Sequence, residues 1–238
     1  MARQPSQDHY QVLFDTAATL FDERGYLGTS LTDLLERAAV TRASFNRSFA
    51  NKEAVAVAIV QHMTEQWPPF VAALRSWRGF AVDTVVALSF EIAERFRDDV
   101  VVRAGVRLAL ERDTVKEPLP SPVAGWTAEI EDLLSPAGRE LMGMSVPAHV
   151  AANVIVNCLL GVLHVSAAPK EREHIVDRVT EMWTVVLPGL RPTPDPATRI
   201  TTARSLREKA QRGPAPDIMA PRQPPAGESL LSLGSSEV

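Results

Sequence analysis

Apolar residues recur along most of the chain at intervals of three and four positions, which is the period of an α-helix, and the alternation typical of strands is scarce. Near the N-terminus one helical face carries a run of apolar side chains: Leu13, Phe14, Ala17, Leu20 and Phe21. Gly25 ends that helix. Ser30, Thr41 and Asn51 then stand where three further helices can begin, because their side-chain oxygens can accept from the free N–H groups of a first turn. The pattern predicts an all-α protein that opens with short helices.

Longer apolar stripes follow further along the chain. Pro68-Pro69 breaks or kinks the fourth helix, and beyond it the period predicts helices over 80–96, 100–110, 126–134 and 171–187. The stretch 150–168 contains no Asp, Glu, Lys or Arg and approaches the length of a membrane span. Because it includes Asn153, Asn157 and His164, a buried helix that is apolar all round explains it better. No membrane partner is expected.

Residues 31–49 have the pattern of two short helices joined by a tight turn. Leu31, Leu35 and Ala38 anchor the first helix, and Phe45 and Phe49 anchor the second. The second helix is expected to present the remaining side chains outward: Arg42, Ala43, Ser44, Asn46, Arg47 and Ser48. Such a helix fits the DNA major groove. An ordinary helical corner with no DNA role would show the same spacing.

Charge and reactive residues narrow the possible functions. The net charge of −4 excludes a protein that coats DNA by being basic throughout, so DNA binding would depend on a local patch. The positive charge of such a patch is small, because residues 30–53 contain four basic and three acidic side chains. The single cysteine, Cys158, excludes an intrachain disulfide and a cysteine cluster for zinc. The five histidines form no metal or catalytic motif. We expect no enzyme, no cofactor and no metal site.

Residues 10–53 resemble the TetR family of transcription regulators. The resemblance is carried by Gly25-Tyr26, by Thr29-Ser30-Leu31, and by the motifs Ala38-Ala39-Val40-Thr41-Arg42 and Phe49-x-x-Lys52-Glu53. Further along, Val102-Arg103-Ala104-Gly105-Val106-Arg107-Leu108 and the prolines before Trp126 are similar to the γ-butyrolactone autoregulator receptors of actinomycetes. The resemblance implies a homodimer that represses transcription from a palindromic operator. A small signalling lactone, or an antibiotic in the related pseudo-receptors, would release the DNA.

The resemblance and the helix positions assign DNA contacts to Arg3, Ser30, Thr41, Arg42, Ala43, Ser44, Asn46, Arg47, Ser48 and Lys52. Lys52 is the leading candidate for a phosphate contact, because it begins a helix whose free N–H groups also attract anions. For Lys52 and Thr41 the alternative is an ordinary solvated charge or cap.

Two positions depart from the family pattern. Asn46 replaces the usual tyrosine, and Ala39 replaces the usual glycine of the turn. Asn46 and Arg47 could read a different operator, since asparagine suits adenine and arginine suits guanine. Alternatively, DNA binding is degraded and the same dimeric fold acts through a protein partner.

The resemblance places Trp126 in the wall of an effector pocket, with a plain core tryptophan as the alternative. Further predicted lining residues are Val86, Phe90, Leu108, Ile130, Asn157, Gly161 and Trp183. Most of these could simply be core residues. Asn157 is a polar residue in an apolar helix and needs partners, either a lactone carbonyl or a second subunit. Gly161 would let a ligand or a partner helix approach closely.

The chain divides into three predicted parts: a helix-turn-helix domain in 1–50, a ligand-binding and dimerisation domain in 51–190, and a disordered proline-rich tail in 191–238. Within the tail, 198–211 could form a polar helix. The dimer is expected to use helices near 148–165 and 171–187, two from each subunit, in a four-helix bundle. The polar N-terminus lacks a signal sequence, so a cytoplasmic protein is expected.

Overall fold

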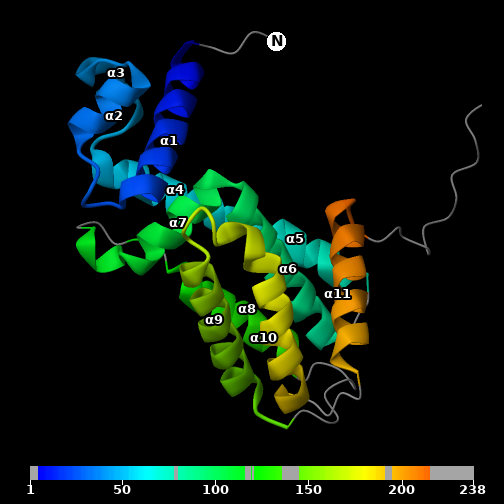
Figure 1. Cartoon of the computed structure of the whole chain (residues 1–238). Coiled ribbons are helices and arrows are strands. Elements are labelled where there is room, and N and C mark those ends of the chain that lie inside the picture. Colours follow the sequence, from blue (N-terminus) through cyan, green and yellow to red (C-terminus); the bar gives the residue numbers. More distant parts are fainter. Residues whose placement is uncertain are drawn as a thin grey trace, which may run out of the picture.

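A computed structural model describes residues 5–77, 80–115, 119, 121–135, 145–190 and 195–214. Within these residues every regular element is a helix, which confirms the all-α prediction. A small head at one end of the molecule (Figure 1) consists of α1 (Pro5–Arg24), α2 (Leu31–Ala38) and α3 (Arg42–Ser48).

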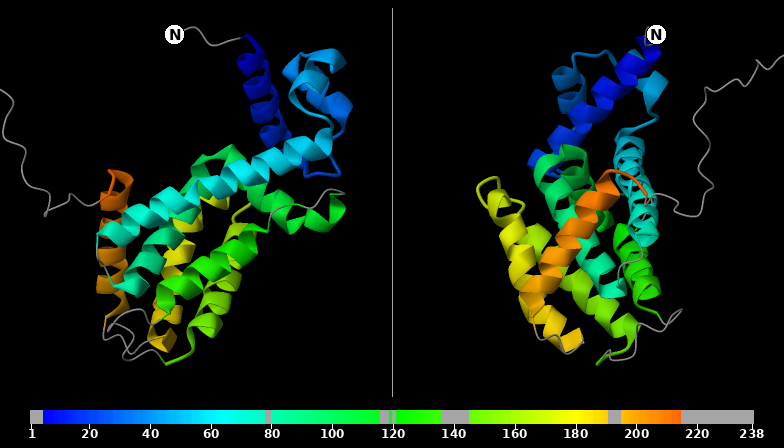
Figure 2. Two further views of the ribbon diagram at one scale, coloured as in Figure 1. Left: turned by 180° about the vertical axis from the view of Figure 1, so that it is seen from behind. Right: turned by 90° about the vertical axis from the view of Figure 1, so that its right-hand side faces the viewer.

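The larger body below the head contains the remaining helices: α4 (Lys52–Glu65), α5 (Trp67–Ser76), α6 (Ala81–Asp98), α7 (Val100–Leu110), η1 (Arg112–Thr114), α8 (Pro122–Leu134), α9 (Ala148–Val165), η3 (Arg172–His174), α10 (Ile175–Leu190) and α11 (Pro196–Gln211). Figure 2 shows α4 and α5 running nearly end to end, from beneath the head to the far side of the body. Gln66 lies between them, and Pro68 and Pro69 stand in the first turn of α5.

The short helices of the head begin at the predicted caps. The Ser30 hydroxyl accepts from Asp33 N while Asp33 Oδ2 accepts from Ser30 N at 2.7 Å, which is a complete capping box. Thr41 Oγ1 accepts from the N–H of Ser44 at 3.2 Å, and Asn51 Oδ1 accepts from Ala54 N at 2.7 Å. These local bonds define where each helix starts.

The body is arranged around α6, which is buried along almost its whole length and contacts α8, α10 and α11. On α10 the apolar stripe of Ile175, Val179 and Trp183 is completely buried within the subunit. These three residues therefore cannot supply the part of the dimer interface that was expected from the helix at 171–187. The helix also continues through Pro188 to Leu190, past the predicted end at 187.

The polar helix considered for 198–211 is present as α11 (Pro196–Gln211), which packs against α5 and α6, so the expectation of disorder is wrong for this part of the tail. Although α11 is polar in composition, one of its faces is buried and consists of Ile200, Ala203, Leu206 and Ala210. Residues 191–194 and 215–238 lie outside the described residues.

Two carboxylates of α6 are buried beneath α11. Asp83 and Glu91 are both 3% exposed. Asp83 pairs with Arg199 of α11 at 2.8 Å, and Glu91 accepts from Gln211 of α11 at 2.8 Å. A further α11 cation, Arg207, pairs with Glu94 at 2.5 Å. Because a buried carboxylate is costly unless it is paired, these bonds from α11 stabilise α6.

Candidate functional site

The outer face of α3 carries most of the predicted DNA-reading residues. Thr41, Arg42, Ala43, Asn46 and Arg47 are exposed, and Ser48 is half-buried. Ser44 is 6% exposed, its hydroxyl has no hydrogen-bond partner, and it lies beside the buried Phe45. The expectation that Ser44 points outward is therefore wrong, because a helix of seven residues buries one side of each turn against α1.

The turn between α2 and α3 depends on Ala39. This residue has φ 52°, in the left-handed region, and it is the one non-glycine residue of the described chain with a positive φ. Its N–H donates to Glu36 O and that of Val40 donates to Leu35 O, at 3.2 and 3.1 Å. These bonds close the end of α2 in the way that a glycine commonly does, and alanine adopts this conformation at a cost.

Lys52 is engaged within the head. Its Nζ donates to the carbonyl oxygens of Tyr26 and Thr29 at 2.9 and 2.7 Å and lies 3.9 Å from the centroid of the Tyr26 ring. Burial lowers the pKa of the Lys52 ammonium. The side chain therefore fixes the α1–α2 loop on α4, a geometry that does not favour the phosphate contact predicted for it.

Two further residues predicted to contact DNA are Ser30 and Arg3. The Ser30 hydroxyl is used in the capping box, and it also lies 2.5 Å from Asp33 Oδ2. Arg3 lies outside the described residues.

A polar junction joins the head to α7. Arg103 Nε donates to Asp22 Oδ2 at 2.8 Å, and Arg107 donates to Asp22 O at 2.8 Å. Glu111 accepts from Arg107 Nε at 2.8 Å and from the backbone N–H of Tyr26 at 3.0 Å. The end of α1 is therefore held to the body by charged groups in addition to apolar packing.

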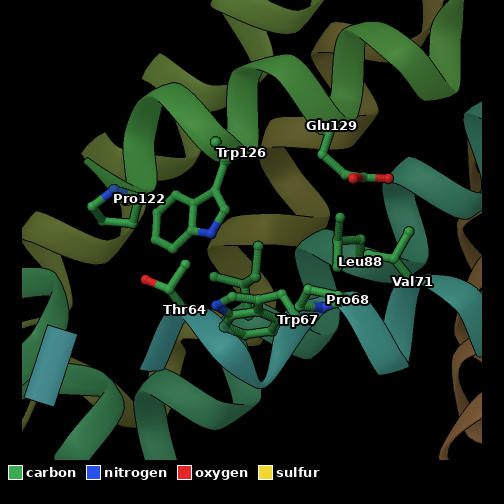
Figure 3. A pocket seen from close by; sticks show the side chains of 10 residues that line it. Thr64, Trp67, Pro68, Val71, Leu88, Pro122, Trp126 and Glu129 are labelled. Carbon is green, nitrogen blue, oxygen red and sulfur yellow. The ribbon is translucent and has the colours of Figure 1, made fainter. Parts of the chain in front are cut away.

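An apolar cavity of about 140 Å³ lies where α4 meets α5, beneath α8. Its lining comes from four helices and consists of Thr64, Trp67, Pro68, Val71, Leu88, Ile92, Pro122, Gly125, Trp126 and Glu129 (Figure 3). The Trp67 and Trp126 rings approach from α5 and α8, with centroids 6.4 Å apart and planes at 88°. Both Nε1–H groups are buried and have no hydrogen-bond partner.

These two N–H donors determine what kind of ligand the cavity favours. A buried N–H that lacks an acceptor is costly, and an occupant with acceptor oxygens would remove that cost while its apolar part contacts the walls. Trp183 Nε1 is also buried without a partner, but this ring does not line the cavity.

The predicted pocket residues divide into three groups. Trp126 lines the cavity. A second group is buried in the core without lining it: Val86, Phe90, Leu108, Ile130 and Trp183. Asn157 and Gly161 are exposed on α9, and apart from the adjacent residues and the backbone of the same helix no described atom lies within 4 Å of a Cβ placed on Gly161. Their assignment to the pocket is wrong for this subunit, since they lie on the opposite side of α9 from its core contacts.

Sequence reasoning missed Trp67, Thr64 and Glu129. The signal for Trp67 was its place directly before Pro68-Pro69, where a helix break opens space beside a large ring. Glu129 gave no such signal, because its neighbours on the helix are also acidic. Its role is visible only in space, where Arg75 of α5 pairs with Glu129 and Asp132 of α8 at 2.7 and 2.6 Å and so connects α5 and α8 at the cavity.

The exposed side of α9 forms an apolar face with the adjoining part of α10. Val150, Val154 and Val165 of α9 are exposed, and Val185 of α10 is 79% exposed. By length and composition α9 could also cross a membrane, with 33% of the relevant stretch buried. Its exposed side, however, includes Asn157 and Gly161, and its other side packs on α8 and α10.

Comparisons with known proteins agree with this architecture. The family described as bacterial regulatory proteins, tetR family, matches residues 13–59, and the tetracyclin repressor-like C-terminal domain matches residues 80–192. Together the two matches cover the head and most of the body. The chain belongs to the TetR family of bacterial regulators.

Its relatives are regulators and receptors. The A-factor receptor protein of Streptomyces griseus is 29% identical over 211 residues, 85% of this chain and 73% of that protein. A gamma-butyrolactone receptor structure is 25% identical, covers 87% of this chain and 100% of its own, and has a TM-score of 0.72. The TetR family protein CprB from Streptomyces coelicolor, solved with its biological operator sequence, is 27% identical, covers 86% and 99%, and has a TM-score of 0.73.

Proposed function

We propose that this chain is a transcriptional repressor that binds an operator through α3 and is released from it by a small molecule of the γ-butyrolactone type. The observation that carries the proposal is the cavity at the α4–α5 break, where two unpartnered indole N–H groups meet apolar walls. A lactone has the matching chemistry, with a carbonyl acceptor and an apolar chain. For release to follow, the effector must bind the released conformation more tightly than the DNA-bound one.

The exposed face of α3 supports DNA binding. Asn46 and Arg47 point away from the core, and their side chains suit adenine and guanine in the major groove. A specific operator that differs from those of the relatives is therefore favoured over degraded DNA binding. The relatives' descriptions as receptors and as an operator-bound regulator support the same conclusion.

We also propose that the protein acts as a homodimer in the cytoplasm. The apolar face formed by Val150, Val154, Val165 and Val185 suits a symmetric four-helix interface. Asn157 would then pair across the interface, and Gly161 would allow a close approach of the partner helix.

The test is a gel shift with DNA fragments from around the protein's own gene, at low and high salt. Each lane is repeated with an alkyl γ-butyrolactone and with an extract of the producing culture. Saturable binding that resists competitor DNA and is abolished by lactone or extract supports the repressor. Binding at no more than the non-specific level in low salt overturns the repressor and favours a dimer that acts through a protein partner.

A further inference from the structure

The two tryptophans of the cavity differ in what their helices contact. Trp126 belongs to α8, on the wall of the body. Trp67 is the first residue of α5 and is separated from the last residue of α4, Glu65, by Gln66 alone. At the other end of α4, Lys52 holds the α1–α2 loop of the head through two carbonyls. A displacement of Trp67 would therefore act on α4, whose other end lies under the DNA-binding head (Figure 2).

Trp67 is also held in place from outside the cavity. The guanidinium of Arg95 lies 5.2 Å from the Trp67 ring centroid, which is a cation–π contact. Arg95 Nη1 donates to Gln66 Oε1 at 2.7 Å, and its Nε donates to Glu91 at 2.6 Å. The ring and the linking residue between α4 and α5 are thus fixed by one side chain of α6. The indole N–H is nevertheless left without an acceptor.

We infer that Trp67 is a second hydrogen-bond donor to the effector and the residue through which effector binding reaches α4. Trp126 contributes to affinity, whereas Trp67 contributes both to affinity and to DNA release. Two donors on separate rings further select an effector with two acceptor oxygens over one with a single acceptor. This inference rests on the proposed function, and it adds a residue and a ligand property to it.

The first experiment separates binding from release. Trp67→Phe and Trp126→Phe each keep an aromatic ring and remove one N–H. Effector binding is measured by calorimetry, and DNA release by fluorescence anisotropy of a labelled operator. The probe is a γ-butyrolactone with a hexanoyl chain, which has two carbonyls. Trp77→Phe is the matched control, because Trp77 Nε1 donates to Gly213 O and lies outside the cavity.

Each cavity variant should bind the probe roughly 3- to 10-fold more weakly, the value of one hydrogen bond. At saturating probe, Trp126→Phe should still release the operator fully, Trp67→Phe should remain partly bound, and Trp77→Phe should behave as wild type. If Trp67→Phe at equal probe occupancy releases DNA as wild type does, the coupling role is overturned. If wild-type protein binds neither the probe nor the operator, the proposed function itself fails, which is a different result.

A second measurement needs no variant and so does not depend on how Trp67→Phe folds. Wild-type protein is titrated with the hexanoyl lactone, with a hexyl lactone that has one carbonyl, and with hexylcyclopentane, which has none. Two donors predict that affinity falls at each step of this series. Equal affinity for the two lactones would overturn the second-donor assignment.

Discussion

The backbone N–H of Tyr26 donates to Oε2 of Glu111 at 3.0 Å, although the two residues are 85 positions apart. Gly25 stands beside this bond with φ +72°, and a Cβ at that position would lie 2.7 Å from the same carboxylate oxygen. Because glycine adopts this conformation freely and leaves room for the carboxylate, the loop after α1 can lie directly on the end of α7. The orientation of the head is therefore set partly by one glutamate of the body.

Glu111→Ala should loosen this junction, since it removes the acceptor of the Tyr26 N–H and leaves Arg107 with Asp22 O alone. We expect a loss of about 1–2 kcal/mol in the free energy of unfolding and a weaker operator affinity. Both are measurable by urea titration and by anisotropy with labelled operator. Glu173→Ala, at an exposed position near the start of α10, is the matched control. Equal effects of the two substitutions would contradict the junction's role.

The outer face of α3 leads to a prediction about specificity. Asn46→Ala and Arg47→Ala should each weaken operator binding by about 1–3 kcal/mol and leave non-specific DNA binding nearly unchanged. Ser44→Ala should leave operator affinity as it is, because that hydroxyl is buried and unpartnered. Competition gel shifts with operator and random DNA measure all three. A large loss for Ser44→Ala alone would mean that α3 presents a different face to DNA.

Ala39 leads to a prediction of increased stability. Ala39→Gly relieves an alanine at φ 52° and should raise the free energy of unfolding by about 0.5–1 kcal/mol. Ala43→Gly places the same substitution in a regular helix and should lower it by about 1 kcal/mol. Thermal unfolding followed by circular dichroism gives both values. A lower melting temperature for Ala39→Gly would show that the turn does not need the left-handed conformation.

The capping box leads to a prediction about pH. Hydrogen bonds from the Ser30 hydroxyl and backbone N–H lower the pKa of Asp33 below its ordinary value of 3.8. Because the folded state favours the carboxylate, the box stabilises α2 above pH about 4, and this contribution is lost as the pH falls through the lowered pKa. Ser30→Ala should raise the pKa of Asp33 towards 3.8. Carboxyl NMR titration measures the shift, with Ser205→Ala as the control, and an unchanged pKa in Ser30→Ala would rule out the box.

The contact between α6 and α11 leads to a fifth prediction. Arg207 is 8% exposed and pairs with Glu94 beside the buried Glu91. Arg207→Ala should cost about 1.5–3 kcal/mol, because it removes the charged partner of Glu94, while Glu91 keeps Arg95 and Gln211. Arg212→Ala, an exposed substitution one turn further on, should be close to neutral. Denaturant unfolding compares them, and a neutral Arg207→Ala would mean that α11 contributes little to the body.

The features that the sequence predicts correctly are those set by interactions between residues close together in the chain. Ser30, Thr41 and Asn51 were identified as caps because a cap is defined by bonds to residues two or three positions away. The break at Pro68-Pro69 was identified for the same reason, since proline acts on its own helix turn.

What the sequence could not predict depended on distant neighbours. In α9 the absence of charged residues favoured burial on all sides, although its polar residues His149, Asn153, Asn157 and His164 all lie on the exposed side. The assignment of Asn157 to the pocket is wrong for this reason. In α11 the composition predicted an exposed helix, because polar residues surround Ile200 and Leu206 in the sequence, yet these two residues belong to a buried face. The position of Lys52 at a helix start predicts a contact with a phosphate anion. Only the fold brings the Tyr26 and Thr29 carbonyls to its ammonium group.

The pairing of Asp83 with Arg199 also has a consequence for synthesis on the ribosome. The two residues are 116 positions apart, which at about 5–20 residues per second separates their emergence by roughly 6–23 s. During that interval the head can already fold, since its caps are local, while Asp83 and Glu91 still lack the partners that α11 supplies. Completion of the body is thus a late event, and a nascent chain that stalls before residue 196 would present a folded DNA-reading head on an unfinished sensor.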